Sequence, residues 1–139
     1  MPATSPQLMA GGDIYPSRFV RISASADNKG TQCGANELPI GVSGVGTNVA
    51  PLNDLVTDAK HATSGQNIRL HGDGEECLVE AAEAITRGAR VKSDADGKAV
   101  NAATTGTTPQ NVGGIAQDSV SGAGEMLKIQ VLIGSHSPQ

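Results

Sequence analysis

The chain has 139 residues, 37 % of them hydrophobic, and its 10 basic and 14 acidic residues give a formal net charge of −4. This length suits one compact domain with a modest core. The longest apolar run, residues 131–133, is far too short to cross a bilayer, and no basic run favours direct nucleic-acid binding.

The first 22 residues combine a polar, proline-containing arm with an extended segment. Residues 1–12 show no helix or strand period. Their composition favours a frayed terminus over a tail that orders on a neighbouring subunit. Residues 14–22 follow a strand pattern, with Phe19 and Arg21 on one face and Val20 and Ile22 on the other.

A turn, a second strand and a long connection follow. The run 27–30 (Asp-Asn-Lys-Gly) predicts a turn in which Gly30 supplies the positive φ. Residues 40–45 predict a strand whose glycines permit close backbone approach. The connection 47–65 contains apolar residues near Leu55 that fit either one helical turn or a buried loop.

The remainder reads mainly as strands and turns. Residues 75–88 favour a strand through Ala81 and then a turn or short helix to Gly88, although helical spacing also fits. Asp96-Gly97 is a hairpin signal, and the Thr-rich stretch 101–110 predicts an exposed loop. The other expected elements are strands at 67–70, 89–92, 98–100, 112–116 and 126–133, and a polar tail at 135–139.

These elements form a series that occurs twice. Each copy reads as a strand, a polar turn, a short glycine-containing strand, a Ser-Gly turn and an alternating strand. The sequence therefore predicts a mainly β protein with little helix: one barrel or sandwich-like domain at 13–134, built from copies at 13–74 and 75–134. Only one Phe and one Tyr are available for its core, so we expect association with other subunits to add stability.

No pattern of reactive or metal-binding residues stands out. Asp94-Ala95-Asp96-Gly97 resembles the start of a calcium loop but is followed by a strand pattern, which favours a plain hairpin. His61, His71 and His136 show no ligand spacing and are expected to be solvated loop residues. The glycine-rich run 41–46 lacks a phosphate-loop ending and favours close strand packing.

The remaining candidates also favour structural roles. The carboxylates of the stretch 75–83 have no spacing that brings two of them together, so a solvated face is expected. Cys33 and Cys77 match no zinc motif and are expected to be free thiols rather than a disulfide. We therefore predict no catalytic, cofactor-binding or metal-binding residues, no cofactor, and a protein that is not an enzyme.

The second copy resembles a known family. The spacing Ile85, Gly88, Val91, the hairpin Asp96-Gly97-Lys98, the strand 112–116 and the final strand 128–132 are similar to the capsid decoration, or cement, proteins of tailed bacteriophages. The first copy matches as a weaker version of the same unit. Order and spacing of common residues carry this resemblance, more than any single residue.

The resemblance implies a structural role on a virus particle. It implies a small β-rich homotrimer, made in the host cytoplasm, that sits on the outer surface of the capsid. There it would bind the major capsid protein where subunits meet, with the arm 1–12 ordering on the capsid or on a sister subunit. Two alternatives stay open: a carbohydrate- or cell-surface-binding β module of a phage fibre or spike, and an enzyme using a cysteine or carboxylates.

Overall fold

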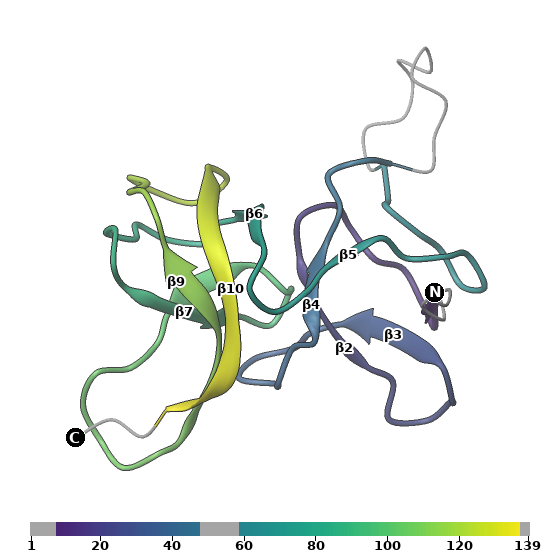
Figure 1. Cartoon of the computed structure of the whole chain (residues 1–139), viewed down its shortest axis with the longest axis horizontal. Helices are drawn as coiled ribbons and strands as arrows, with labels where there is room; N and C mark the ends of the chain where they lie inside the picture. Colours follow the sequence, from purple (N-terminus) through teal and green to yellow (C-terminus); the bar gives the residue numbers. More distant parts are fainter. Residues whose placement is uncertain (1–7, 48–58, 137–139) are drawn as a thin grey trace.

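The computed structural model describes residues 8–47 and 59–136, which fold as β-strands joined by turns and loops (Figure 1). The described residues contain no helix, and therefore no helix that could span a membrane. In these described ranges, ten strands make two five-stranded sheets. Their bounds are β1 (Met9–Ala10), β2 (Phe19–Ile22), β3 (Lys29–Gln32), β4 (Gly41–Ser43), β5 (Leu70–His71), β6 (Glu76–Glu80), β7 (Arg90–Ser93), β8 (Ala99–Asn101), β9 (Gln110–Ala116) and β10 (Met126–His136).

The two sheets repeat one topology, as the sequence series predicts. The first has the order β1-β3-β2-β4-β5 and the second β6-β10-β9-β7-β8. Read from β8, the second contains β8-β7-β9-β10, which matches β3-β2-β4-β5 strand for strand with antiparallel pairing throughout. The expected junction of the two copies falls in the turn between β5 and β6.

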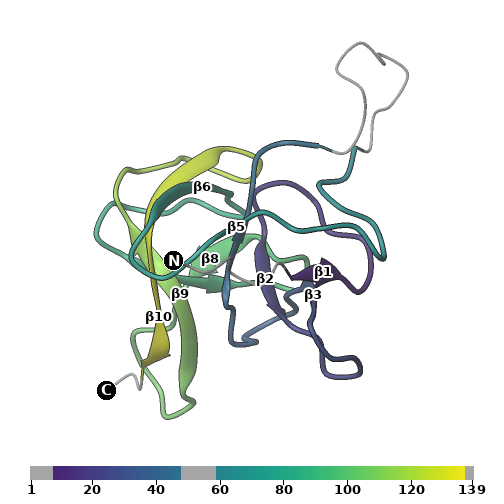
Figure 2. The ribbon, with the colours of Figure 1, turned by 45° about the vertical axis from the view of Figure 1, so that its right-hand side comes forward.

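The remaining strand of each unit, β1 or β6, contacts both ends of this four-strand order. In the first unit, β1 runs parallel to β3 and makes an antiparallel bridge to Asn67, just before β5. In the second, β6 pairs antiparallel with β10 and its end, Ala81, bridges Ala99 in parallel. Figure 2 shows the two curled units side by side, with β6–β10 in one and β1–β5 in the other. We call them the first unit and the second unit.

Two hydrophobic clusters form the core of the described residues, and β2 contributes to both. Val20 packs with Ala10, Ile14, Ala62 and Ile68 inside the first unit. Phe19, on the opposite face of the strand, belongs to the larger cluster of the second unit with Val91, Leu127 and Ile129. The predicted alternation along β2 is therefore present, but at its start both faces are buried because each faces a different core.

Phe19 and backbone hydrogen bonds join the two units. A Cβ on Gly113 would lie only 2.4 Å from the Phe19 ring, so glycine is required where the ring packs. The Phe19 N–H donates to the Gly97 carbonyl at 2.8 Å, and the Glu80 N–H donates to the Ser17 carbonyl at 2.9 Å. Because these bonds and the shared cluster bury the contact, the units behave as one domain.

Several local expectations need correction. The end of the expected arm is ordered, since Met9–Ala10 form β1. Asn28, not Gly30, takes the positive φ of the first turn, and Gly30 lies in β3, where a Cβ would meet the Leu8 side chain at 2.7 Å. β10 continues through His136, two residues into the expected tail. The apolar part of the 47–65 connection, around Leu55, lies outside the described residues.

The ambiguous stretch 75–88 resolves as strand β6 followed by turns, without a helix. Cys77 and Val79 are buried while Glu76 and Leu78 are exposed, so the alternating pattern decides the outcome. Pairing with β10 along five residues stabilises the extended form. Gly88 has a φ of +86°, which suits its expected place at the end of this segment.

Candidate interaction surface

The Asp94–Gly97 segment is a hairpin turn between β7 and β8, as the sequence favours. The Asp94 Oδ1 accepts hydrogen bonds from the Asp96 N–H at 2.8 Å and the Lys98 N–H at 2.9 Å. The carboxylate is thus used to hold the turn. Among the residues that the structure describes, no group of three potential metal ligands comes together.

His61 has a structural role that the sequence does not predict. Its Nε2 accepts a hydrogen bond from the Arg69 N–H at 3.0 Å, so its Nδ1 carries the proton and donates to the Gly46 carbonyl at 2.7 Å. It therefore joins two loops and is not simply solvated. His71 lies in β5 beside Glu75, and the side chain of His136 is outside the description.

The carboxylates of the stretch 75–83 make separate structural contacts. Glu80 pairs with Arg18 at 3.4 Å and with Lys98 at 3.2 Å, which links the two units. The Glu83 carboxylate accepts the Asn101 N–H at 2.9 Å and so protects the edge of β8. The two carboxylates therefore have different partners, and each is used in a structural contact.

Both cysteines are buried free thiols, as expected. Burial, together with the nearby Glu37 carboxylate, raises the pKa of Cys33 to about 12. Burial and Glu75 raise the pKa of Cys77 to about 11. A thiol held protonated in this way is a poor nucleophile at neutral pH, which argues against cysteine catalysis.

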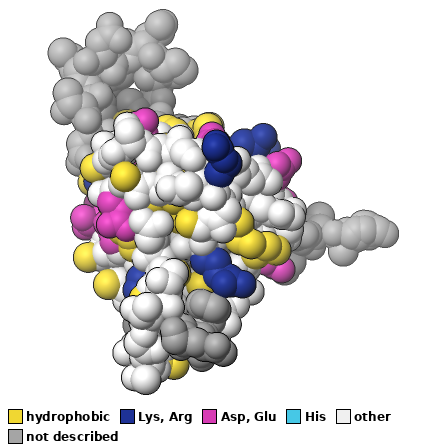
Figure 3. All heavy atoms as spheres, turned by 90° about the vertical axis from the view of Figure 1, so that its left-hand side faces the viewer, with side chains coloured by type: hydrophobic (Ala, Val, Ile, Leu, Met, Phe, Trp, Pro, Cys, Tyr) yellow, Lys and Arg dark blue, Asp and Glu magenta, His cyan; other side chains and the backbone are white. Residues whose placement is uncertain are grey.

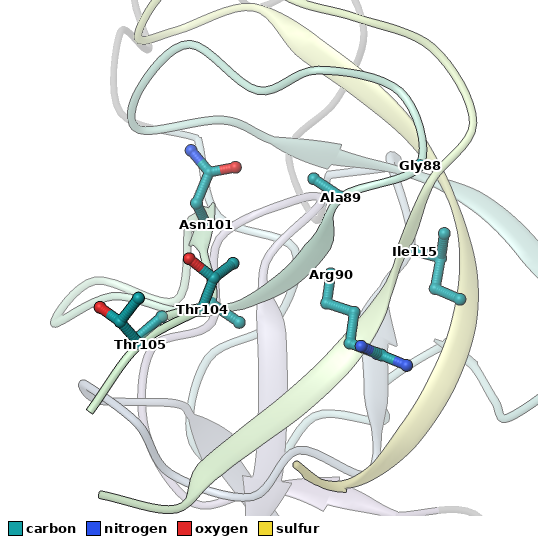
Figure 4. A pocket seen from close by; sticks show the side chains of 9 residues that line it. Gly88, Ala89, Arg90, Asn101, Thr104, Thr105 and Ile115 are labelled. Atoms are coloured by element: carbon teal, nitrogen blue, oxygen red, sulfur yellow. The ribbon is translucent and has the colours of Figure 1, made fainter. Parts of the chain in front are cut away.

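An open cleft of about 720 Å³ lies on the second unit beside β7. We call it the Arg90 cleft; Figure 4 shows Arg90 and Ile115 on one side and Asn101, Thr104 and Thr105 on the other. Within the described part of the chain, the Arg90 guanidinium has no hydrogen bond or ion pair. The cleft therefore offers an exposed cation among hydroxyl, amide and apolar groups.

Arg90 and Ile115 also line a neighbouring cleft of about 290 Å³ with Leu132 and Ile133. Leu132 is 38 % exposed. Figure 3, which looks at this side of the molecule, shows hydrophobic side chains close to lysine and arginine groups. Such a mixture of apolar and cationic side chains is typical of protein-contact surfaces.

The first unit carries its own apolar cleft, of about 340 Å³, lined by Ile22, Leu38 and Ile40 with the ion pair Arg21–Glu37. Ile22 and Leu38 are 50 % and 51 % exposed. We call it the Ile22–Leu38 cleft. The sequence does not predict the Arg90 cleft or the Ile22–Leu38 cleft, because an alternating strand pattern does not show which apolar face remains uncovered. One signal in the sequence points to the Ile22–Leu38 cleft: Ile22 lies on the same strand face as Val20 but beyond the buried part of the strand.

Comparisons with known proteins bear on the fold. No family model and no curated protein matches this sequence. Among solved structures, the chain is similar to the N base of the head fibre gp8.5 of bacteriophage phi29, with a TM-score of 0.52 and 18 % identity. The match covers 96 % of this chain and 94 % of that chain. The likeness shows that this chain and that protein share one overall fold along nearly their whole lengths.

Proposed function

We propose that this protein is a capsid decoration protein that binds the outer surface of an assembled phage head and stabilises contacts between major capsid subunits. The observation that carries the proposal is the full-length likeness of its fold to a head-fibre base. The motif resemblance of the second copy to cement proteins points to the same place on a virion. The two arguments are independent, since one rests on topology and the other on sequence spacing.

The surface described above suits a clamp between subunits. Binding of this kind needs apolar and charged area spread over the protein, not an enclosed reactive site. The Arg90 cleft and the Ile22–Leu38 cleft supply such areas on both units. Many copies on one shell add avidity, so each contact can be modest.

The proposed partners follow from the same reasoning. The protein binds the major capsid protein and associates with itself, as a trimer by the family resemblance. A net charge of −4 does not favour DNA as a direct partner. The proposed role is structural and uses no cofactor, and it places the protein on the outside of the virion.

Shell binding tests the proposal directly. Purified protein is mixed with mature phage shells that lack their decoration protein, and uptake is measured by co-sedimentation together with the temperature at which the shells open. We expect saturable uptake and a higher opening temperature. Absence of uptake, with the protein shown to be folded by circular dichroism, would refute the proposed function.

A second candidate is the base of a fibre, which the likeness to a head-fibre base supports. In its carbohydrate-binding form this alternative has little support, because sugar sites use exposed aromatic rings. Phe19 is fully buried, and the Tyr15 ring lies 5.2 Å from the Arg18 guanidinium and 5.6 Å from the Lys60 ammonium. Clear binding on a glycan array, without binding to shells, would favour a carbohydrate-binding module over decoration.

A further inference from the structure

The two units correspond residue by residue around β2 of the first and β7 of the second. The Cys33 N–H donates to the Phe19 carbonyl at 2.9 Å, and the Ala102 N–H donates to the Arg90 carbonyl at the same distance. Phe19 pairs with Val42 on the neighbouring strand, as Arg90 pairs with Ile115. Arg90 therefore occupies in the second unit the place that Phe19 occupies in the first.

In the first unit, the surface around Phe19 is the one that binds the second unit. Besides the bonds made by Ser17 and Phe19, the Asn36 N–H donates to the Ser93 carbonyl at 3.1 Å. The Arg18 Nη1 donates to the Asp96 carbonyl at 2.9 Å, and Phe19 and Cys33 complete the second unit's core. The tip of the β7–β8 hairpin, Asp96-Gly97, sits against this surface.

In the second unit, the corresponding surface is vacant. The Arg90 cleft is lined by Gly88, Ala89 and Arg90 and by the segment Asn101–Thr105. These are the counterparts of Ser17, Arg18 and Phe19 and of the segment that begins at Gln32. The repeat thus has one binding surface filled within the chain and a second, equivalent surface open to the solvent.

The receiving surface is also present twice. In the second unit, Ser93 and Asn111 bind Asn36 of the first unit. The Ser93 carbonyl accepts the Asn36 N–H. The Asn111 side chain donates to the Asn36 carbonyl at 2.8 Å, and the Asn111 backbone N–H donates to the Asn36 Oδ1 at 3.0 Å. The counterpart of Ser93 in the first unit is Ile22, and the segment before β4 that holds Leu38 takes the place of Asn111. The Ile22–Leu38 cleft is therefore the unfilled counterpart of the surface that receives the first unit.

The charges of the two vacant surfaces are complementary. Asp27 lies just before Asn28, whose φ is +57°, as Asp96 lies just before Gly97, whose φ is +79°. The Asp27 carboxylate is exposed and, like the Arg90 guanidinium, makes no ion pair or hydrogen bond within the described residues. Asp27 thus stands at the tip of the hairpin that corresponds to the one bound by Arg18 and Phe19.

We propose that a second copy of this chain binds in the Arg90 cleft through its β2–β3 hairpin and its Ile22–Leu38 cleft, with Asp27 of one copy facing Arg90 of the next. The contact is head-to-tail, because each copy contributes a different surface, and such contacts build closed rings or open filaments. This inference goes beyond the proposed function: it assigns the self-association surfaces, and it holds whatever larger assembly the protein binds.

Mixing two charge variants of the full chain tests the proposal. Arg90→Asp damages the Arg90 cleft and Leu38→Asp damages the Ile22–Leu38 cleft, and both positions are exposed, so folding should survive and is checked by circular dichroism. By light scattering coupled to size exclusion, we expect wild type to form oligomers and each variant alone to be monomeric. An equimolar mixture should form dimers and nothing larger, since one intact surface of each kind remains.

Arg69→Asp is the matched control, because Arg69 is an exposed arginine away from both clefts, and it should associate like wild type. A double variant, Arg90→Asp with Asp27→Arg, should regain oligomers. The proposal is overturned by a wild type that stays monomeric at about 100 µM, a concentration that would populate any contact with a micromolar Kd. It is equally overturned if the variants still form oligomers, or if their mixture stays monomeric. Shell uptake is measured separately, so loss of self-association and loss of capsid binding are distinguishable.

Discussion

Phe19 fills the core of a unit to which its own strand does not belong. It is the only phenylalanine of the chain and is fully buried in the cluster of the second unit. In a core built otherwise from aliphatic side chains, one large ring supplies an unusual share of buried area. Gly113 leaves the space that the ring occupies.

Phe19→Ala should therefore lower the free energy of unfolding by about 3–5 kcal/mol, the range for removing a buried aromatic side chain. Urea unfolding followed by circular dichroism measures the change. Leu78→Ala, at a side chain 41 % exposed, is the control and should cost much less. A loss at Phe19 no larger than that of the control would show that the ring does not join the two units.

The cysteines predict a loss of stability in alkali. Their folded-state pKa values of about 12 and about 11 lie above the ordinary value of 9.0. The unfolded chain thus releases thiol protons first, and stability that is complete below pH 9 falls as the pH rises toward 11–12. Thermal unfolding between pH 8 and pH 11 should show this fall. A Cys33→Ala, Cys77→Ala variant should show a shallower one, and an equally steep fall in that variant would contradict the assignment.

At the scale of elements, the duplicated series predicts the topology well because alternation and turn residues act locally. Leu127, Ile129 and Val131 are buried as expected, and the Asp96-Gly97 hairpin forms. The sequence does not reveal that Phe19 crosses into the other unit, nor that His61 joins two loops. Both depend on contacts between distant segments, and the exposure of Ile22 and Leu38 depends on where the two units cover one another.

The β7–β8 hairpin offers a test of its role between the units. Gly97 has a φ of +79°, and a Cβ there would lie 2.9 Å from the Gln32 side chain and 3.2 Å from the Phe19 carbonyl. Gly106 has a φ of +103° with open space around it. Gly106→Ala should cost only the backbone strain, about 1–3 kcal/mol. Gly97→Ala should lower the free energy of unfolding, measured with urea, by more than Gly106→Ala does. Equal losses would mean that the hairpin tip does not pack on the first unit.

At the scale of the whole molecule, two similar units make one contact with each other. Each unit therefore leaves uncovered the surface that corresponds to the one its partner uses in that contact. The internal contact uses Phe19, Cys33 and the Arg18–Glu80 pair, and its counterparts are the Arg90 cleft and the Ile22–Leu38 cleft. A small aliphatic core gains stability when such surfaces are covered. The proposed self-association and the proposed attachment to a shell would each cover these surfaces.

Electron cryomicroscopy of mature, undecorated phage shells incubated with the purified protein tests the central claim most directly. The proposed function predicts added density on the outer surface, at the points where major capsid subunits meet, into which the two-unit fold fits. Neighbouring copies should meet through the Arg90 cleft of one and the β2–β3 hairpin of the next. Shells that show no added density at saturating protein would contradict the account.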